Sequence, residues 1–395
     1  MTALMLLVAV QLSALLAQQA SRHAVVGPLA QAGSAAPAGT VQIAPGQPLP
    51  DRAWIERRMP TGAIRSYMQT GGKHGRVFYH PGLQAMVFAG GDWHTTQPQY
   101  EGGSGTGSEI WALDVRNDRW KLLRPFCVPD ETQPGGPDTV GWAYDSKRDR
   151  GLMTPGFYFI TQGAKSPCGA IYGLGGYAFS FETKKFTGPD GSAGLPPPPS
   201  GWGGDVGASF GLYNPTLDEY VRVRNGPSLE RLNLSAKTWT MQTLSNGNPN
   251  WNPVPNRSQP AIDVKGQAVY WLDAWSSPKA LIKINLKNGS VASIPLPPHY
   301  AQPAGQDHEI YLAFDPGNRV VLIPNNVDMG TSPIKGLGVY HVDTGQWQWE
   351  AVPPTVLGSV WGFDEATGAM IGIGQRTPPF AYFLYKYGSS STGSR

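Results

Sequence analysis

One turn motif recurs six times along the 395-residue chain and constrains its fold more than any other feature. In each copy, an aromatic or aliphatic residue ends an apolar run, a turn-forming residue follows, and a second apolar run begins after the turn. The side chain of a turn-forming Asp or Asn bonds the backbone two residues further on, which starts the turn. Apolar runs of four to six residues between such turns predict short β-strands. The six copies are Tyr79-His80, Tyr144-Asp145, Tyr213-Asn214, Ile262-Asp263, Phe314-Asp315 and Phe363-Asp364.

A second series of turns runs in step with the first. Its copies begin at Leu113, Phe179, Leu232, Ile284 and Tyr340, and each is followed by an aromatic residue or Val that opens the next strand. The six turns of the first series are 65, 69, 49, 52 and 49 residues apart. Four strands in a meander occupy about 45–50 residues, the length of one propeller blade. The two series together predict six blades.

The stretch from Gly75 to Leu123 is the template for the repeat. It carries the pair Gly90-Gly91, and Trp111 and Trp120 flank an Asp turn, a pattern that resembles a kelch repeat. This fold-level resemblance to the kelch and galactose-oxidase central-domain superfamily implies an all-β, six-bladed propeller over residues 51–388. The expected blades are 75–123, 139–189, 206–244, 257–296, 308–353 and 357–387.

The last blade lacks an outer strand, and a segment near the N-terminus matches the missing one. Trp54 and Pro60 are six residues apart, as are Trp347 and Pro353 at the end of the fifth repeat. The segment from about residue 52 to 60 is therefore expected to pair into the last blade and close the ring. Closure removes two sheet edges that would otherwise invite aggregation.

Composition fits many short strands and limits the partners. Gly 50 and Pro 37 together make 22% of the chain, while aromatic and apolar runs between them argue against low complexity. Charged residues make up 15% and the net charge is +3, too little and too dispersed to indicate nucleic acid or an anionic membrane as a partner.

The N-terminal segment predicts export. The apolar run from Leu4 to Ala17 is short for a membrane span and fits the hydrophobic region of a signal peptide within residues 1–20. A short hydrophobic helix docked on a partner is the alternative. Residues 21–50 are poor in large apolar groups and are expected to form a flexible tether, and residues 389–395 a disordered tail. The expected location is secreted, periplasmic or on the cell surface.

The long connections are expected on one face, opposite the short turns, and binding is expected there because long loops in compact domains are usually functional or disordered. Cys127 and Cys168 both fall in these loops, in neighbouring blades. A disulfide between them would close a loop of about 40 residues and stabilise the fold by roughly 4 kcal/mol. Two free thiols are the alternative, and no metal or other cofactor is expected.

The inner ends of the loops supply polar side chains around the expected channel, and aromatic residues surround them. Aromatic faces stack on sugar C–H surfaces while carboxylate, Arg and His groups bond hydroxyls, so the set predicts a glycan or protein site. Polar channel groups that hold only water, and loop Trp residues that only pack, are the alternative. The polar candidates are His74, Asp138, Asp205, Arg257, His308 and Glu309, and the loop candidates are Trp93, His94, Tyr100, Phe157, Trp202, Trp251, Trp275 and Tyr300.

Three functions stay open. The first is an exported, non-catalytic propeller that binds a glycan or protein through its long-loop face. The second is a structural subunit of an extracellular assembly such as a surface layer, appendage or virion. The third is a sugar-modifying enzyme similar to sialic-acid mutarotases, in which Asp205, Arg257, His308 and Glu309 would transfer protons. A copper site like that of galactose oxidase is not supported, since both cysteines fall in loops. The chain has no nucleophile elbow, Walker loop, HExxH or Cys-x-x-Cys pattern.

Overall fold

The structure is a computed structural model in which two compact units are distinguished, residues 1–33 and 34–395. Everything below concerns described residues of the second unit. The structure describes residues 39–59, 76–89, 110–125, 128–134, 141–154, 171–173, 175–188, 194–199, 209–224, 228–247, 259–273, 279–297, 300, 311–325, 336–356, 360–373 and 381–388.

The strands form six antiparallel sets of four, numbered here in chain order. Set 1 contains β2 (Arg76–His80), β3 (Ala85–Ala89), β4 (Ile110–Asp114) and β5 (Arg119–Arg124). Set 2 contains β7 (Gly141–Asp145), β8 (Arg150–Thr154), β10 (Tyr177–Ser180) and β11 (Phe186–Thr187). Set 3 contains β12 (Ser209–Asn214), β13 (Glu219–Arg224), β14 (Ser228–Asn233) and β15 (Thr238–Thr243).

The second half of the chain repeats the pattern. Set 4 contains β16 (Ala261–Asp263), β17 (Ala268–Asp273), β18 (Ala280–Asn285) and β19 (Val291–Pro295). Set 5 contains β20 (Ala313–Asp315), β21 (Val320–Pro324), β22 (Leu337–His341) and β23 (Gln346–Glu350). Set 6 contains β24 (Val360–Asp364), β25 (Ala369–Ile373), β26 (Ala381–Tyr385) and β1 (Trp54–Arg58). A small parallel pair joins β6 (Thr132–Pro134) to β9 (Ile171–Gly173).

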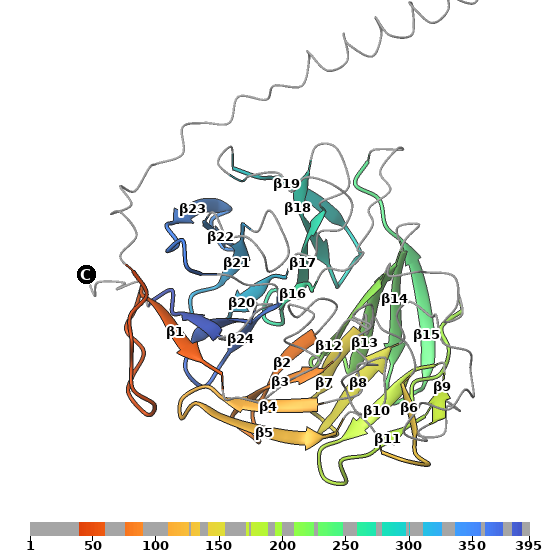
Figure 1. Ribbon diagram of the computed structural model, residues 1–395. Coiled ribbons are helices and arrows are strands. Elements are labelled where there is room, and N and C mark those ends of the chain that lie inside the picture. The colour runs from red at the N-terminus through yellow and green to blue at the C-terminus, as the bar shows by residue number, and fades with distance from the viewer. Residues whose placement is uncertain are drawn as a thin grey trace, which may run out of the picture. The chain divides into compact units, whose positions relative to one another are not determined.

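The fold is a β-propeller. Figure 1 shows the first strand of each set, from β2 to β24, toward the middle of a ring of sheets, with strands such as β5, β15, β19 and β23 farther out. Hydrophobic clusters lie between sets 1 and 2, 2 and 3, 3 and 4, and 4 and 5, and a larger one joins sets 5, 6 and 1. Each sheet therefore buries both faces against its neighbours. The described residues contain no helix long and apolar enough to span a membrane.

The predicted pairing of the N-terminal segment is observed. β1 runs antiparallel to β26, with Trp54 opposite Tyr385 and Arg58 opposite Ala381. The Trp54 ring lies 4.7 Å from the Tyr385 ring and meets Trp361 edge-on at 6.1 Å. Aromatic contacts of this kind contribute about 0.5–1.5 kcal/mol beyond buried area, so they help to fix this strand in the last sheet.

Six separate blades were expected, and the sheet count differs. Four sets are separate four-stranded sheets, whereas sets 2 and 3 join into one eight-stranded sheet through a parallel pair of Gly211 with Gly141. The Tyr220 side chain explains the junction, because its hydroxyl reaches from set 3 to the Thr154 hydroxyl of set 2 at 2.9 Å. A Cβ at Gly211 would lie 1.6 Å from this hydroxyl oxygen, and one at Gly141 would lie 2.3 Å from it. Only glycine lets the two inner strands approach beneath the phenol.

Sets 1 to 5 are also joined, each to the next, by polar contacts between the turns that follow their first strands. The first turn residue is buried in all six sets, and the fifth lies in the left-handed region, with φ between 47° and 68°. The fifth residue reaches the first turn residue of the preceding set: Asp149 reaches His80, Gln267 reaches Asn214, and Arg319 reaches Asp263. These contacts, with the Arg148-mediated one described next, are called the turn latches below.

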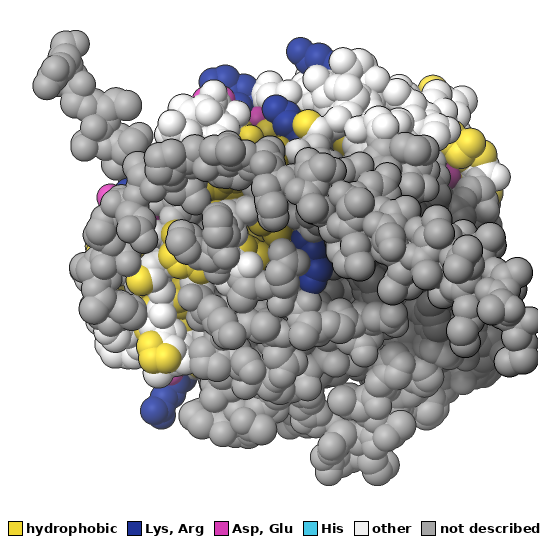
Figure 2. Space-filling view, turned by 90° about the horizontal axis from the view of Figure 1, so that it is seen from above, with side chains coloured by type: hydrophobic (Ala, Val, Ile, Leu, Met, Phe, Trp, Pro, Cys, Tyr) yellow, Lys and Arg dark blue, Asp and Glu magenta, His cyan; other side chains and the backbone are white. Residues whose placement is uncertain are grey.

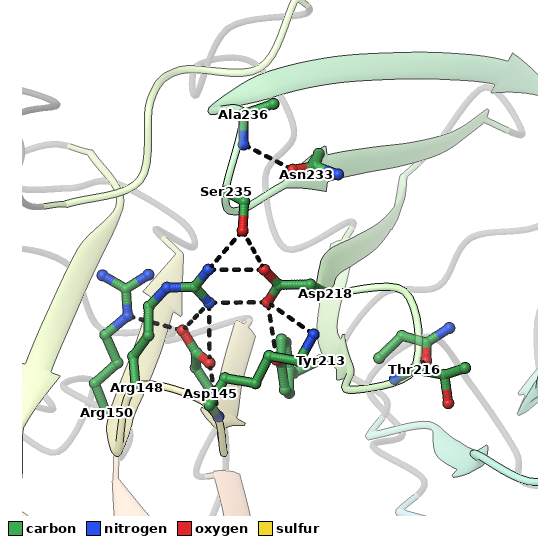
Figure 3. A network of polar contacts seen from close by, with 11 residues as sticks. Asp145, Arg148, Arg150, Tyr213, Thr216, Asp218, Asn233, Ser235 and Ala236 are labelled. Carbon is green, nitrogen blue, oxygen red and sulfur yellow. Dashed lines mark hydrogen bonds and ion pairs between the residues drawn. The ribbon is translucent and has the colours of Figure 1, made fainter.

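The latch between sets 2 and 3 is an ion network (Figure 3). Arg148 donates to both oxygens of Asp218 at 2.8 and 2.7 Å and also to Asp145 at 3.1 Å. Its guanidinium holds the pKa of Asp218 well below the ordinary value. The Tyr213 hydroxyl donates to the same carboxylate at 3.0 Å, so the network also fixes a side chain of the inner strand.

We predict that Gly211→Ala destabilises the protein by about 3 kcal/mol or prevents folding, since overpacking of a well-packed core costs about 1–3 kcal/mol even where side chains can move. The clash here is with a fully buried phenol. Urea unfolding measures the effect. Gly39→Ala is the matched control, because nothing lies within 4 Å of a Cβ built there. Equal midpoints for Gly211→Ala and the wild type would contradict the close approach of the two strands.

Candidate functional site

The first strands of the sets enclose a cavity of about 930 Å³. Its walls come from β2, β7, β12, β16, β20 and β24 and from the short turns that follow them. This volume lies within the range of about 300–1,000 Å³ that is usual for small-ligand sites. The cavity is the candidate functional site.

A ring of apolar side chains lines the cavity, one from each set. Each occupies the position directly before the turn, so the repeat itself places them at one level. All are partly exposed except Tyr213, which is buried. The ring consists of Tyr79, Tyr144, Tyr213, Ile262, Phe314 and Phe363.

Packing and hydrogen bonds hold the aromatic rings in place. Tyr144 stacks on Phe78 with ring centroids 5.4 Å apart, and its hydroxyl donates to Asp149 at 2.8 Å. Burial, followed by the hydrogen bond to Asp149, raises the pKa of Tyr144, and burial likewise raises that of Tyr213. Both phenols are therefore neutral near pH 7 and act as hydrogen-bond donors. They are fixed surfaces for a ligand to pack against, and their pKa values do not suit them as bases.

One end of the cavity is bridged by polar contacts. The Gln259 side chain, which precedes set 4, donates to the Val77 carbonyl at 2.9 Å and accepts from the Val77 amide at 3.2 Å, as a strand would. Arg76, also in set 1, donates to the Tyr311 hydroxyl at 3.0 Å and lies over its ring. These residues are buried or half-buried, whereas most of the ring of apolar side chains near the turns is partly exposed.

Charged groups stand at the turn side of the cavity. Lys265, Lys287 and Glu365 line it, together with the paired Asp263 and Arg319. The site thus combines aromatic faces with separate cationic and acidic groups, a combination that can hold a molecule with both C–H faces and hydroxyl groups. Among the described residues, no group of three or more His, Cys, Asp or Glu side chains is arranged to hold a metal ion.

The site residues inferred from the sequence cannot be compared with this geometry. His74, Trp93, His94, Tyr100, Asp138, Phe157, Trp202, Asp205, Trp251, Arg257, Trp275, His308 and Glu309 all lie outside the described residues, as do Cys127 and Cys168. The long-loop site and the disulfide therefore stay predictions.

One aromatic residue expected at the loop surface is placed elsewhere. Tyr300 is buried, meets Trp349 edge-on and donates its hydroxyl to the Pro324 carbonyl at 3.3 Å. It packs within the core between sets 4 and 5, so its assignment to a ligand face was wrong. Tyr300 follows Pro297, Pro298 and His299, and this local sequence carries no signal that separates packing in the core from contact with a ligand.

The aromatic ring of the cavity was missed as a site although its residues were recognised. In the sequence, the residue before each turn serves as a marker of the repeat. The available signal was that the same position is aromatic in five of six copies, with Ile262 as the exception. Equivalent positions in a propeller lie at equivalent places around its axis. The residues that mark the repeat in the sequence therefore line the central cavity together.

On the face shown in Figure 2, described Lys and Arg side chains are scattered among hydrophobic and neutral ones and form no continuous basic patch. This distribution agrees with the small net charge of +3.

Comparisons with known proteins give no family. No known protein family matches the chain, and no curated protein resembles it significantly. Among solved structures, TolB from Acinetobacter baumannii is similar with 10% identity and a TM-score of 0.42, over 72% of this chain and 55% of that one. An auxiliary nutrient binding protein from Bacteroides thetaiotaomicron is similar with 8% identity and a TM-score of 0.48, over 80% of this chain and 69% of that one. At these values neither likeness indicates a function.

We predict that the thermal stability falls as the pH is lowered below about 6.5, in part through His80. His80 is buried, its Nδ1 accepts from the Leu83 amide at 3.1 Å, and its Nε2 lies 2.9 Å from Asp149. Burial lowers its pKa, and Asp149 opposes the shift only in part. The unfolded chain therefore takes up the proton at higher pH than the folded one, so the stability present above pH 6.5 is lost as the pH falls.

Calorimetry between pH 7.5 and 5.5 measures this slope. His80→Asn is the matched variant, because Asn214 occupies the same turn position in set 3. It is expected to show a shallower decline. Parallel curves for the variant and the wild type would exclude His80 as the titrating group.

Proposed function

We propose that the chain is an exported, non-catalytic binding propeller that holds a glycan in its central cavity. The observation that carries this proposal is the ring of partly exposed aromatic side chains around a cavity of about 930 Å³. Sugars offer C–H faces that pack on aromatic rings, and their hydroxyls bond to charged groups such as those of Lys265 and Glu365. A protein ligand is the alternative within the same function.

The finer features of the architecture belong to the same proposal. Counting the eight-stranded sheet as two blades gives a six-bladed, kelch-like ring closed by β1 in the last blade. Packing of set 6 against both set 5 and set 1 supports closure. Residues 1–20 would be the export signal, residues 21–50 the tether, and Cys127 and Cys168 a disulfide. The long-loop face, with Trp93 and Trp251, would extend the site beyond the cavity.

We predict that replacing Phe314 and Phe363 together with Ala weakens glycan binding at least about tenfold, because each lost aromatic contact is worth about 0.5–1.5 kcal/mol beyond its area. A glycan array identifies the ligand, and calorimetry measures its affinity. Phe186→Ala is the matched control, since Phe186 is a partly exposed aromatic residue of the outer strand β11 and does not line the cavity.

The variants separate the two candidate faces. Loss of binding in the Phe314/Phe363 variant alone supports the cavity, and loss in Trp93→Ala or Trp251→Ala alone supports the long-loop face. Unchanged binding in all of these variants would reject the glycan site.

A second candidate function, a subunit of an extracellular assembly, is favoured by the edge strand β15. Its sequence, Thr-Trp-Thr-Met-Gln-Thr, contains no charged residue, and its outer residues are exposed, with Met241 at 60%. Edge strands without charge, proline or a bulge readily pair with other chains. In contrast, β5 carries Arg119, Lys121 and Arg124.

For this candidate we predict that the protein self-associates at micromolar concentration and that Met241→Lys makes it monomeric, because a charge on an edge strand opposes pairing. Sedimentation velocity measures the effect. Leu122→Lys on β5 is the control, since Leu122 is 42% exposed on a strand that already carries charge. A monomeric wild type would count against assembly through β15.

A further inference from the structure

One wall of the central cavity differs from the other five. In sets 1, 2, 3, 5 and 6 the residue directly before the turn is aromatic, whereas set 4 has Ile262 there. Among the described residues that line the cavity, the two lysines are Lys265 and Lys287, and both belong to set 4. The wall that offers no aromatic face is therefore the wall that carries ammonium groups.

The two lysines stand on turns that are bonded to each other. Lys265 lies in the turn between β16 and β17, and Lys287 lies in the turn between β18 and β19. The Leu286 amide donates to the Gln267 carbonyl at 2.8 Å, which joins the two turns. The Lys287 amide donates to the Asn285 side chain at 2.8 Å. The backbone that carries the two side chains is thus one hydrogen-bonded unit.

The ammonium groups of both lysines are available to a ligand. Lys265 and Lys287 are exposed, and neither side chain forms a hydrogen bond or an ion pair with another described residue. The carboxylate of the same turn, Asp263, accepts from Arg319 through both of its oxygens at 2.9 Å. Arg319 is held further by Asp343 at 2.8 Å. The guanidinium is therefore committed to the protein, and the two ammonium groups are not.

The acidic group of the cavity that forms no ion pair within the described part of the chain stands on a different wall. Glu365 belongs to set 6, and set 5 packs between set 6 and set 4. A negative group of a ligand is attracted to the set 4 wall and repelled from the set 6 wall, where hydroxyl groups can donate to Glu365. The cavity therefore favours a ligand that carries negative charge at one end.

We propose that the ligand of the central cavity is an acidic sugar, with its anionic group against Lys265 and Lys287 and its C–H faces on the aromatic walls. This inference rests on the proposed glycan function. The anionic group is a carboxylate, as in a hexuronate, or a sulfate ester, and an ammonium group binds either as a point charge. A neutral sugar offers these lysines only hydroxyl oxygens, which form weaker hydrogen bonds with a cation than charged oxygens do.

A glycan array of matched pairs tests the proposal with the full-length protein. One set of pairs compares oligogalacturonides with their methyl esters, and the other compares sulfated galactose oligosaccharides with their unsulfated forms. The acidic member is expected to bind about tenfold more tightly in titration calorimetry, because it gains two exposed charge contacts. This preference should shrink as the salt concentration rises from about 50 to 300 mM, since salt screens exposed charges. The set of pairs with the larger preference identifies the anionic group.

Lysine variants locate the contact. Lys265→Gln and Lys287→Gln are each expected to weaken binding of the acidic member about twofold to fivefold, the usual contribution of an exposed ion pair, and to leave binding of the neutral member unchanged. Lys147→Gln is the matched control, since Lys147 occupies the same turn position in set 2 and does not line the cavity. Both cavity lysines are exposed, so the variants are expected to fold, and thermal unfolding checks this.

The outcomes separate this proposal from the one on which it rests. Equal binding of acidic and neutral members by the wild type, or an unchanged preference in both cavity lysine variants, overturns the acidic-sugar proposal and leaves the glycan function standing. Retention of no glycan by the wild type rejects the glycan function and this proposal with it.

Discussion

The arrangement of the sets depends on the polar contacts made by the buried first residue of the inner turns. Taking a carboxylate such as Asp145 or Asp263 out of water costs several kcal/mol, and only a partner with good geometry offsets it. In sets 1, 3 and 4, that partner comes from the turn of the following set. In set 2, Arg148 and Arg150 of the same set hold Asp145, and Arg148 continues to Asp218 of set 3. Asp149, Asp218, Gln267 and Arg319 adopt the left-handed conformation, which is strained for residues other than glycine. Glycine would fit this backbone conformation without strain, but it has no side chain with which to form the turn latch. Gly368, at the same position of set 6, forms none among the described contacts.

The latches also explain why the candidate site lies on short turns. The residue before each turn lines the central cavity, while the next residue is buried and, in sets 1, 3 and 4, held by the following set. Tyr144 and His80 both contact Asp149, and Tyr213 shares Asp218 with Arg148. The aromatic ring is therefore built on rigid elements, which position ligand contacts more accurately than loops do.

Much of the fold was predictable because the repeat is local. Each turn is specified by its own Asp, Asn or His and by apolar runs on either side, and these signals require no distant partner. The pairing of β1 with β26 was predictable for a related reason, as Trp54 repeats the position of Trp347. The junction of sets 2 and 3 was not predictable, because Gly141 and Gly211 meet only through Tyr220 and Thr154, which are distant in sequence. The burial of Tyr300 was missed for the same reason.

The sequence by itself therefore determined the class of fold, an all-β propeller with a recurring turn, and the N-terminal strand of its last sheet. Only the tertiary structure decided which members of the repeat face a cavity and which face a neighbouring sheet. The physical reason is that turn formation depends on a few adjacent residues, whereas the exposure of a side chain depends on side chains supplied by several sets. Phe363 and Gly211 look ordinary in the chain, and their neighbours in space give them a role.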